Sequence, residues 1–147
     1  MSRSSALDDP ARCACFNLRK AARAITQLYD DALRPSGLRS TQFTVLQHLS
    51  DAGPFTMSDL ADALVTDRTT LTRNLKPLID KGLVQTTVGD DRRQRSIAIT
   101  DAGNDALREA LPLWRQAQTR VVAGLATDRW NGMMADLGDV VRLTQVD

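Results

Sequence analysis

Apolar residues recur at helical spacing through the first third of the chain. Residues three or four apart share one face of a helix, so this spacing predicts two amphipathic helices. The first starts at Cys15, ends at Pro35-Ser36-Gly37, and carries Leu18, Ala22, Ile25, Tyr29 and Leu33. The second starts at a cap of Ser40 or Thr41 and carries Phe43, Leu46 and Leu49. Residues 1–14 are small, polar and charged, and we expect a flexible arm there.

The middle of the chain predicts a short helix, a tight link and a second helix. Thr56-Met57-Ser58-Asp59 is similar to a capping box, and it opens a helix that buries Leu60, Ala61 and Leu64. Val65-Thr66-Asp67 forms the link, in which Thr66 or Asp67 caps the following helix. That helix turns Leu71, Leu75, Leu78 and Ile79 inward, is bent by Pro77, and ends at a left-handed Gly82.

Two short runs of β-forming residues follow, and two helices complete the chain. The segments 83–88 and 96–100 predict a hairpin with an arginine-rich tip. Thr100-Asp101 caps a long helix, kinked at Pro112, whose stripe is Leu107, Ala110, Trp114, Ala117, Val121 and Leu125. Thr127-Asp128 caps a last helix with Trp130, Met133, Met134, Leu137, Val140 and Val141.

This order of elements predicts a mainly α fold with a small β-hairpin wing. Two helices joined by a few residues and followed by a hairpin form a winged helix-turn-helix unit, here residues 39–100. The flanking helices, 15–38 and 101–147, carry apolar stripes that so small a unit covers only in part. Exposed stripes of that size are unusual in a monomer, so we expect them to be dimerisation helices. Residues 15–147 then form a single domain.

Positive charge is concentrated in the middle of the chain. The net charge of the 147 residues is only +1, but residues 66–95 hold seven cations and four anions. Residues 127–147 hold two cations and four anions. A local basic region inside a winged helix-turn-helix unit indicates double-stranded DNA as the partner.

The predicted DNA-binding residues lie on the second helix of this unit and on the hairpin. With its leucines inward, that helix turns hydroxyls and cations outward, which suit base edges and phosphates. An arginine at the tip of a narrow hairpin can enter the minor groove. Asp91 is expected to pair with Arg95 and to hold the shape of the wing. The predicted contacts are Thr66, Arg68, Thr69, Thr72, Arg73, Lys76, Arg92, Arg93 and Arg95.

These segments resemble the MarR family of bacterial transcriptional regulators. The resemblance rests on "TMSDLADALVTDRTTLTRNLKPLIDKGLV" followed by "DDRRQRSIAITDAG", with the wing pattern met by Asp91, Arg93, Ile99, Thr100 and Gly103, and it covers roughly residues 15–145. It implies an obligate homodimer that binds a pseudo-palindromic operator and usually represses transcription. It also implies release by a small aromatic or phenolic ligand or by thiol oxidation.

The segment "CACFNLRKAARAITQLY" resembles the first helix of the branch of the family that senses organic hydroperoxides. Cys15-Phe16 matches the reactive cysteine step and Tyr29 matches one tyrosine, whereas Arg19 and Ser40 stand where that branch has further tyrosines. Cys15 and Tyr29 are therefore candidate redox-sensing residues, since a thiolate near cations is reactive. The alternative is that Cys15 is a small apolar residue buried at the dimer interface.

Other functions find less support in the sequence. An enzyme would need a nucleophile with its base, a metal cluster or a phosphate loop, so no catalytic residue and no cofactor are expected. Two cysteines and the distant His48 do not supply a zinc site. The main alternative is a winged domain that binds protein, but its outward helix would carry apolar anchors. With no apolar run of membrane-spanning length, a cytoplasmic, nucleoid-associated protein is expected.

Overall fold

The computed structural model describes residues 5–88, 91 and 94–145. They form a mainly helical protein with one small sheet, which confirms the predicted fold class. The elements in chain order are α1 (Ser5–Asp8), α2 (Ala14–Leu33), α3 (Ser40–Ala52), β1 (Phe55–Thr56), α4 (Met57–Ala63), α5 (Arg68–Asp80), β2 (Val84–Val88), β3 (Arg95–Ile99), α6 (Asp101–Leu125) and α7 (Thr127–Leu143).

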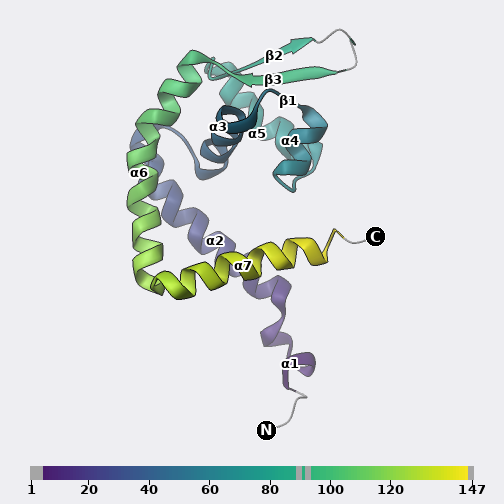
Figure 1. The fold of residues 1–147 in the computed structure, drawn as a ribbon, viewed down its shortest axis with the longest axis vertical. Coiled ribbons are helices and arrows are strands. Elements are labelled where there is room, and N and C mark those ends of the chain that lie inside the picture. The colour runs from purple at the N-terminus through teal and green to yellow at the C-terminus, as the bar shows by residue number, and fades with distance from the viewer. Residues whose placement is uncertain (1–4, 89–90, 92–93, 146–147) are drawn as a thin grey trace.

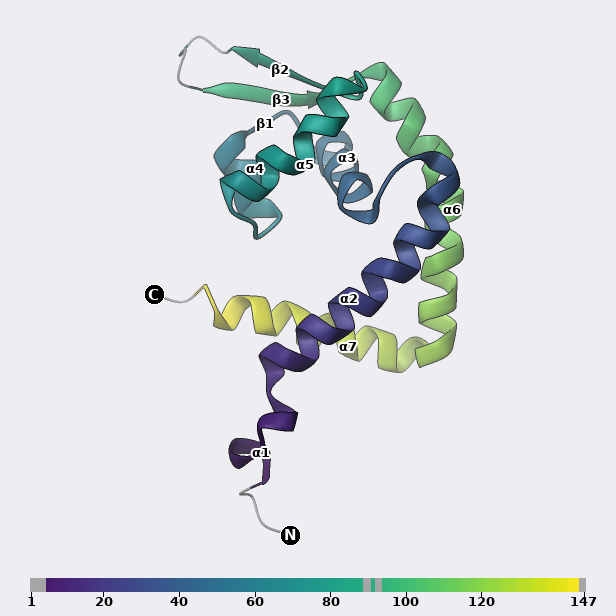
Figure 2. The ribbon, with the colours of Figure 1, turned by 180° about the vertical axis from the view of Figure 1, so that it is seen from behind.

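The elements separate into a winged helix-turn-helix unit and a set of outer helices (Figure 1). The first comprises α3, α4, α5 and the sheet. The long helix α6 leaves the end of β3 and runs along one side of the molecule, and α2 packs on it. Helix α7 turns sharply away at Ala126 and runs below the winged unit, where α2 crosses it in the view from behind (Figure 2).

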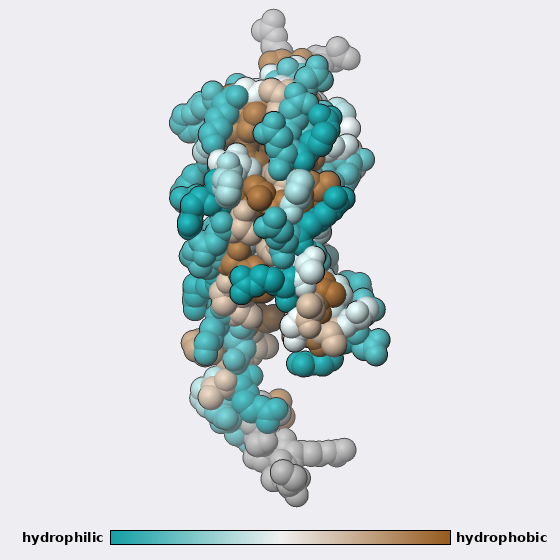
Figure 3. Space-filling model, turned by 90° about the vertical axis from the view of Figure 1, so that its left-hand side faces the viewer, coloured by the Kyte–Doolittle hydropathy of each residue, from teal (hydrophilic) through white to brown (hydrophobic). Residues whose placement is uncertain are grey.

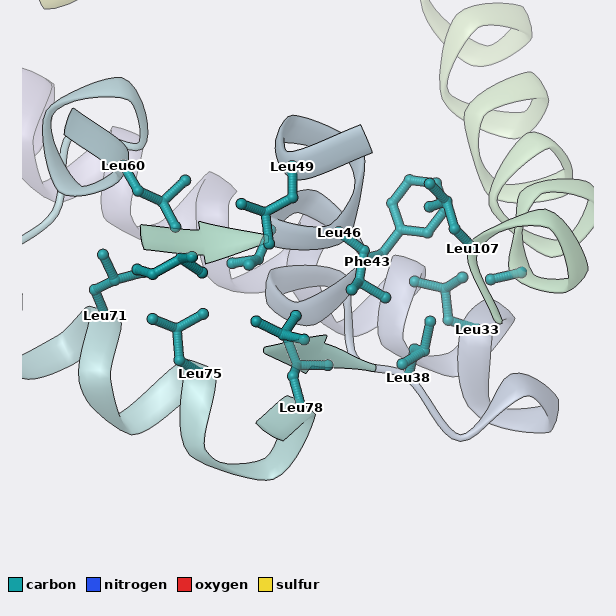
Figure 4. Packing of buried hydrophobic residues seen from close by; sticks show 14 of the residues in the cluster. Leu33, Leu38, Phe43, Leu46, Leu49, Leu60, Leu71, Leu75, Leu78 and Leu107 are labelled. Atoms are coloured by element: carbon teal, nitrogen blue, oxygen red, sulfur yellow. The ribbon is translucent and has the colours of Figure 1, made fainter. Parts of the chain in front are cut away.

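The core lies where α3, α5, the sheet and the start of α6 meet (Figure 4). It is built largely from leucines at three- and four-residue spacing, and these side chains lose almost all contact with solvent. The largest fully buried side chains are Leu33, Leu46, Leu60, Leu71, Leu75, Leu78, Ile97 and Val45. Burial of each such side chain contributes about 1.5–3 kcal/mol, so this cluster fixes how α5 lies against α3.

The wing is an antiparallel sheet in the order β1-β3-β2. Strands β2 and β3 pair from Val84 opposite Ile99 to Val88 opposite Arg95, within one residue of the predicted hairpin strands. The third strand, β1, was missed by the sequence analysis. It has two residues, Phe55 and Thr56, and exists because it pairs with Ile97 and Ser96 far along the chain.

The junction between the wing and α6 is tied by Thr100. Its hydroxyl donates to the Gly82 carbonyl at 2.6 Å and accepts from the Gly103 N–H at 3.0 Å, so the predicted cap of α6 is confirmed. A Cβ at position 103 would lie 2.1 Å from the Leu83 carbonyl oxygen. Only glycine therefore allows α6 to start this close to the wing.

Three details of the predicted helices are wrong. Helix α7 is not capped by Thr127 or Asp128, because its N-cap is Ala126 and no side-chain hydrogen bond caps it. Helix α3 is not capped by Ser40 or Thr41. Its N-cap is Arg39, whose N–H donates to the Gln42 side chain, while Asp30 of α2 accepts from the Ser40 N–H at 2.7 Å. Ile79 was expected inward but is 40% exposed. It lies beside the stripe of Leu71, Leu75 and Leu78, at a position on α5 that the other described elements leave open to solvent.

The N-terminal part of the chain extends away from the rest of the protein (Figures 1 and 2). Within the segment 1–14, where we expect a flexible arm, residues 5–8 form a helical turn and 10–12 a 3₁₀ turn. The Asp9 carboxylate accepts from the Ala11 N–H at 2.9 Å, and Pro10 follows it as the first residue of that turn. Such a cap followed by proline favours a turn, and the sequence analysis did not weigh it.

The outer helices leave apolar side chains exposed in this single chain. Residues 14–27 of α2 are exposed throughout, although α2 is amphipathic. Along α6, apolar and polar side chains alternate on the face shown in Figure 3. Helices α2 and α7 both carry large apolar residues that are exposed. These are Phe16, Leu18 and Ile25 on α2, and Met134, Leu137, Val140, Val141 and Leu143 on α7.

Candidate nucleic-acid interface

Helices α4 and α5, joined by residues 64–67, form the helix-turn-helix. The Thr56 hydroxyl accepts from the Asp59 N–H at 3.1 Å, which confirms the predicted start of α4. Asp67 rather than Thr66 caps α5: its carboxylate accepts from the Thr70 N–H at 2.7 Å and from the Thr70 hydroxyl at 2.7 Å. These hydrogen bonds, the backbone one first, lower the pKa of Asp67. The ionised carboxylate therefore fixes the orientation of the first turn of α5.

The exposed face of α5 carries the residues that the sequence predicted. Leu71, Leu75 and Leu78 are buried at 0–1% exposure. The opposite face is exposed and consists of Arg68, Thr69, Thr72, Arg73 and Lys76. Because the leucines fix the rotation of the helix, these five side chains point to solvent together. Arginine and lysine on one side of a helix present the donors that base edges and phosphates accept.

Two side chains of this face have partners within α5. The Thr72 hydroxyl donates to the Arg68 carbonyl at 2.8 Å. The Lys76 ammonium donates to the Asp80 carboxylate at 2.9 Å, and both groups are well exposed. Exposed pairs of this kind contribute about 0–1 kcal/mol, so phosphate can displace Asp80 at little cost. The sequence analysis overlooked Asp80 as a competitor for Lys76.

The wing brings Arg95 to the same side of the molecule as Arg68. Arg95 is exposed at the start of β3, opposite Val88. The two arginines line one open hollow, together with Gln94 and residues 56–59. From the sequence, residues 56–59 were assigned only to the start of α4 and not to the DNA-binding surface. Its place beside the wing depends on the pairing of β1 with β3, which sequence periodicity does not reveal.

The remaining predicted wing residues are only partly described. Arg92 and Arg93 lie outside the described residues. Asp91 is exposed, and its carbonyl accepts from the Gln94 N–H at 2.9 Å. The expected pair between Asp91 and Arg95 stays a prediction. Thr66 is half-buried in the turn, so it offers less surface to DNA than the exposed residues of α5.

Cys15 and Tyr29 lie far apart on one helix. Both belong to α2, and fourteen residues at 1.5 Å each separate them by ~21 Å. Cys13 and Cys15 are exposed free thiols at the start of this helix. Tyr29 donates a hydrogen bond to the Gln118 amide oxygen of α6, and burial raises its pKa. A contact between Cys15 and Tyr29 within one chain is therefore excluded, and such a contact requires two chains.

A second hollow lies between α2, α3 and α6, at the base of the winged unit. Its lining residues are Ile25, Thr26, Tyr29, Ser40, Phe43, Thr44 and Trp114. The rings of Phe43 and Trp114 stack with centroids 5.8 Å apart. By chemistry alone, the candidates for contact with a small aromatic effector are Trp114, Tyr29, His48 and Arg19. Of these, Tyr29 and Trp114 meet here. His48, with Nδ1 2.9 Å from the Thr44 carbonyl oxygen, and Arg19, on the exposed half of α2, are not among the lining residues.

Among the described residues, His, Cys, Asp and Glu side chains do not gather in groups of three or more that could hold a metal ion. Of the described helices, none combines the length and the apolar character that crossing a membrane requires.

A helix-turn-helix whose second helix is exposed and cationic, followed by a paired hairpin, defines the winged helix-turn-helix class. The sequence model described as MarR family matches residues 36–94, which span α3 to the end of the wing loop. The chain is also 43% identical to the M. tuberculosis transcriptional regulator MosR, solved in complex with DNA. That match covers 91% of this chain and 99% of MosR, with a TM-score of 0.80. The chain belongs to the MarR family.

A second relative and a second solved structure are also similar to this chain. An uncharacterised HTH-type transcriptional regulator of Bacillus subtilis, YwoH, is 34% identical over 83 residues, 56% of this chain. The chain spans 61% of the length of this curated relative. The chain is also similar to MepR in the S. aureus MepR–DNA complex, with a TM-score of 0.76. That match covers 88% of this chain and 97% of MepR. At 21% identity, this likeness shows the fold alone.

Proposed function

We propose that the protein is a transcriptional regulator that binds double-stranded DNA as a homodimer and represses the genes next to its operator. The observation that carries the proposal is the exposed face of α5, with two arginines, two threonines and a lysine on a helix held by three buried leucines. Helix α5 would enter the major groove, and the wing, with Arg95 next to its tip, would follow the backbone. MosR, at 43% identity, was solved with DNA bound.

The exposed apolar residues of α2 and α7 support the homodimer. In a single chain, Phe16 is 54% exposed and Leu143 is 76% exposed, at opposite ends of the chain. Monomers rarely leave stripes of this extent open to water, and a second copy supplies matching apolar surface. Two copies would place two α5 helices about one turn of DNA apart, ~34 Å, or a multiple of it. The operator would then be a pseudo-palindrome.

Selection of bound sequences from random duplexes tests this function. The expected result is a two-fold-symmetric site, bound with an affinity that falls steeply as salt rises because phosphate contacts release counterions. Bound sites without symmetry would contradict the dimer, and the absence of any bound duplex at low ionic strength would contradict DNA binding itself.

We further propose that an effector releases the DNA by binding in the hollow between α2, α3 and α6. The walls combine the Phe43–Trp114 stack with the Tyr29 hydroxyl and the hydroxyls of Thr26, Ser40 and Thr44. Aromatic walls with a few polar groups suit a small aromatic or phenolic molecule. Since the hollow touches both the outer helices and α3, a ligand there can shift the winged unit relative to the dimer. Titration of a Trp130→Phe variant with phenolic acids, read by the fluorescence of the remaining Trp114 and by DNA affinity, tests this role.

Oxidation of Cys15 is the second route of release that we propose. The thiol is exposed at the start of α2, beside the surface that a second copy would cover. Oxidation makes the thiol polar and alters that contact. The expected result is that peroxide weakens operator binding by the wild type but not by Cys15→Ser. Equal weakening of both proteins would exclude this role of Cys15.

A further inference from the structure

Val65 has a left-handed backbone conformation at the end of α4. Its φ is 50°, a value that a β-branched residue adopts only under strain. The Val65 N–H donates to the Asp62 carbonyl at 3.1 Å, and the Thr66 N–H donates to the Ala61 carbonyl at 2.9 Å. These are the two hydrogen bonds of a Schellman helix end, in which the left-handed position is usually glycine.

The end of α5 repeats this motif with glycine at the left-handed position. Gly82 has a φ of 73°, its N–H donates to the Ile79 carbonyl at 2.9 Å, and the Leu83 N–H donates to the Leu78 carbonyl at 2.9 Å. The same chain thus places the unstrained residue, glycine, in the motif that ends α5, and valine at the same position of the motif that ends α4. The backbone geometry does not account for valine at position 65.

Burial does not account for Val65 either. The residue is 61% exposed, whereas Thr66 beside it is half-buried. The isopropyl group therefore gains little from packing within the chain, although its Cβ causes the strain. Strained residues persist where the surrounding structure holds them for a function.

The position of Val65 in the fold indicates that function. It lies in the turn three residues before Arg68, the first residue of α5. In helix-turn-helix proteins, the N-terminal residues of the second helix contact base edges in the major groove, so the exposed part of this turn approaches the same groove. An isopropyl group cannot form hydrogen bonds, and the apolar group that the major groove offers is the methyl of thymine.

We propose that Val65 is a specificity-determining residue whose isopropyl group packs on the methyl group of one thymine in each half-site of the operator. The inference rests on the DNA-binding function proposed above. It predicts that valine at this position lowers the stability of the fold and raises the affinity for the operator.

The test removes one side of the contact at a time, either the methyl group of thymine or the isopropyl group of Val65. An operator duplex selected by the wild type is remade with each thymine replaced, one at a time, by deoxyuridine. We expect one position in each half-site where the loss of the thymine methyl weakens wild-type binding about fourfold. This is the change in affinity that corresponds to the burial of one methyl group. Val65→Gly and Val65→Ala should bind the unmodified operator about fourfold more weakly per half-site, and uracil at that position should not weaken them further.

Thermal unfolding separates this contact from a folding defect. Because relief of the strained φ outweighs the added freedom of the unfolded chain, Val65→Gly should unfold about 2–4 °C above the wild type. Gly82→Val, the matched change in the other motif, should unfold at a lower temperature and keep the wild-type response to uracil. A lower unfolding temperature for Val65→Gly would overturn the strain on which the inference rests.

The two levels of the proposal fail differently. If the wild type binds its operator and both Val65 variants bind every duplex as it does, the thymine contact is wrong and the DNA-binding function stands. The same holds if uracil weakens the variants and the wild type equally at every position. If the wild type binds no duplex at low ionic strength, the proposed function fails and the contact fails with it.

Discussion

The rings of Phe43 and Trp114 stack nearly parallel, with centroids 5.8 Å apart and planes 11° from parallel. Phe43 belongs to α3 and Trp114 to α6, so this contact joins the winged unit to the long outer helix. Phe43 is buried and Trp114 is half-buried. The stack therefore contributes both to the core and to one wall of the hollow between α2, α3 and α6.

Trp114→Ala should lower the free energy of unfolding by about 2–4 kcal/mol, since it removes a large part-buried ring and its stacking. Chemical denaturation followed by circular dichroism measures the change. The matched variant Trp114→Phe keeps an aromatic ring and should retain most of the stability. Equal stability of the alanine variant and the wild type would show that the stack does not hold α6 to α3.

Gly103→Ala should lower the free energy of unfolding by about 2 kcal/mol or more, because the added methyl overlaps the Leu83 carbonyl and the Ile99 side chain. Gly124→Ala on the same helix is the control. A Cβ at position 124 would meet nothing within 4 Å in the protomer, so alanine there should raise stability by about 0.5–1 kcal/mol. Changes of the same sign in both variants would contradict the close approach of α6 to the wing.

Asp67 makes the stability of α5 depend on pH in the acid range. Hydrogen bonds from Thr70 lower its pKa in the folded protein, so the stabilisation is fully present above the ordinary pKa of an aspartate and is lost as pH falls through the lowered value. Asp67→Ala should therefore unfold at a lower temperature than the wild type at pH 7. The difference should shrink as the pH is lowered below 4. A difference that stays constant between pH 7 and pH 3 would exclude this role of the carboxylate.

The fold was largely predictable because its strongest signals are local. The spacing of Leu71, Leu75 and Leu78 fixes the rotation of α5, and this alone identified the exposed face that carries Arg68 and Arg73. The caps at Thr56 and Thr100 follow equally simple rules, and both are confirmed.

The features that the sequence analysis missed depend on contacts between distant residues. Strand β1 exists through pairing with β3, and the cap of α3 comes in part from Asp30, ten residues before Ser40. Ile79 lies at the edge of its stripe, where only the tertiary arrangement decides burial. The wing tip is the other gap: Arg92 and Arg93 lie outside the described residues and stay predictions from the charge pattern.

The central claim is that the exposed cationic face of α5 binds operator DNA. The most direct test is a titration of a selected operator duplex at fixed salt with wild type, Arg73→Ala and Arg108→Ala. Arg108 is an exposed arginine on α6, paired with Asp105 outside the winged unit, and so it controls for the loss of one positive charge. We expect Arg73→Ala to weaken binding at least tenfold, as for the loss of a base or phosphate contact in each half-site, and Arg108→Ala to bind as the wild type does. Equal affinities of all three proteins would contradict the claim.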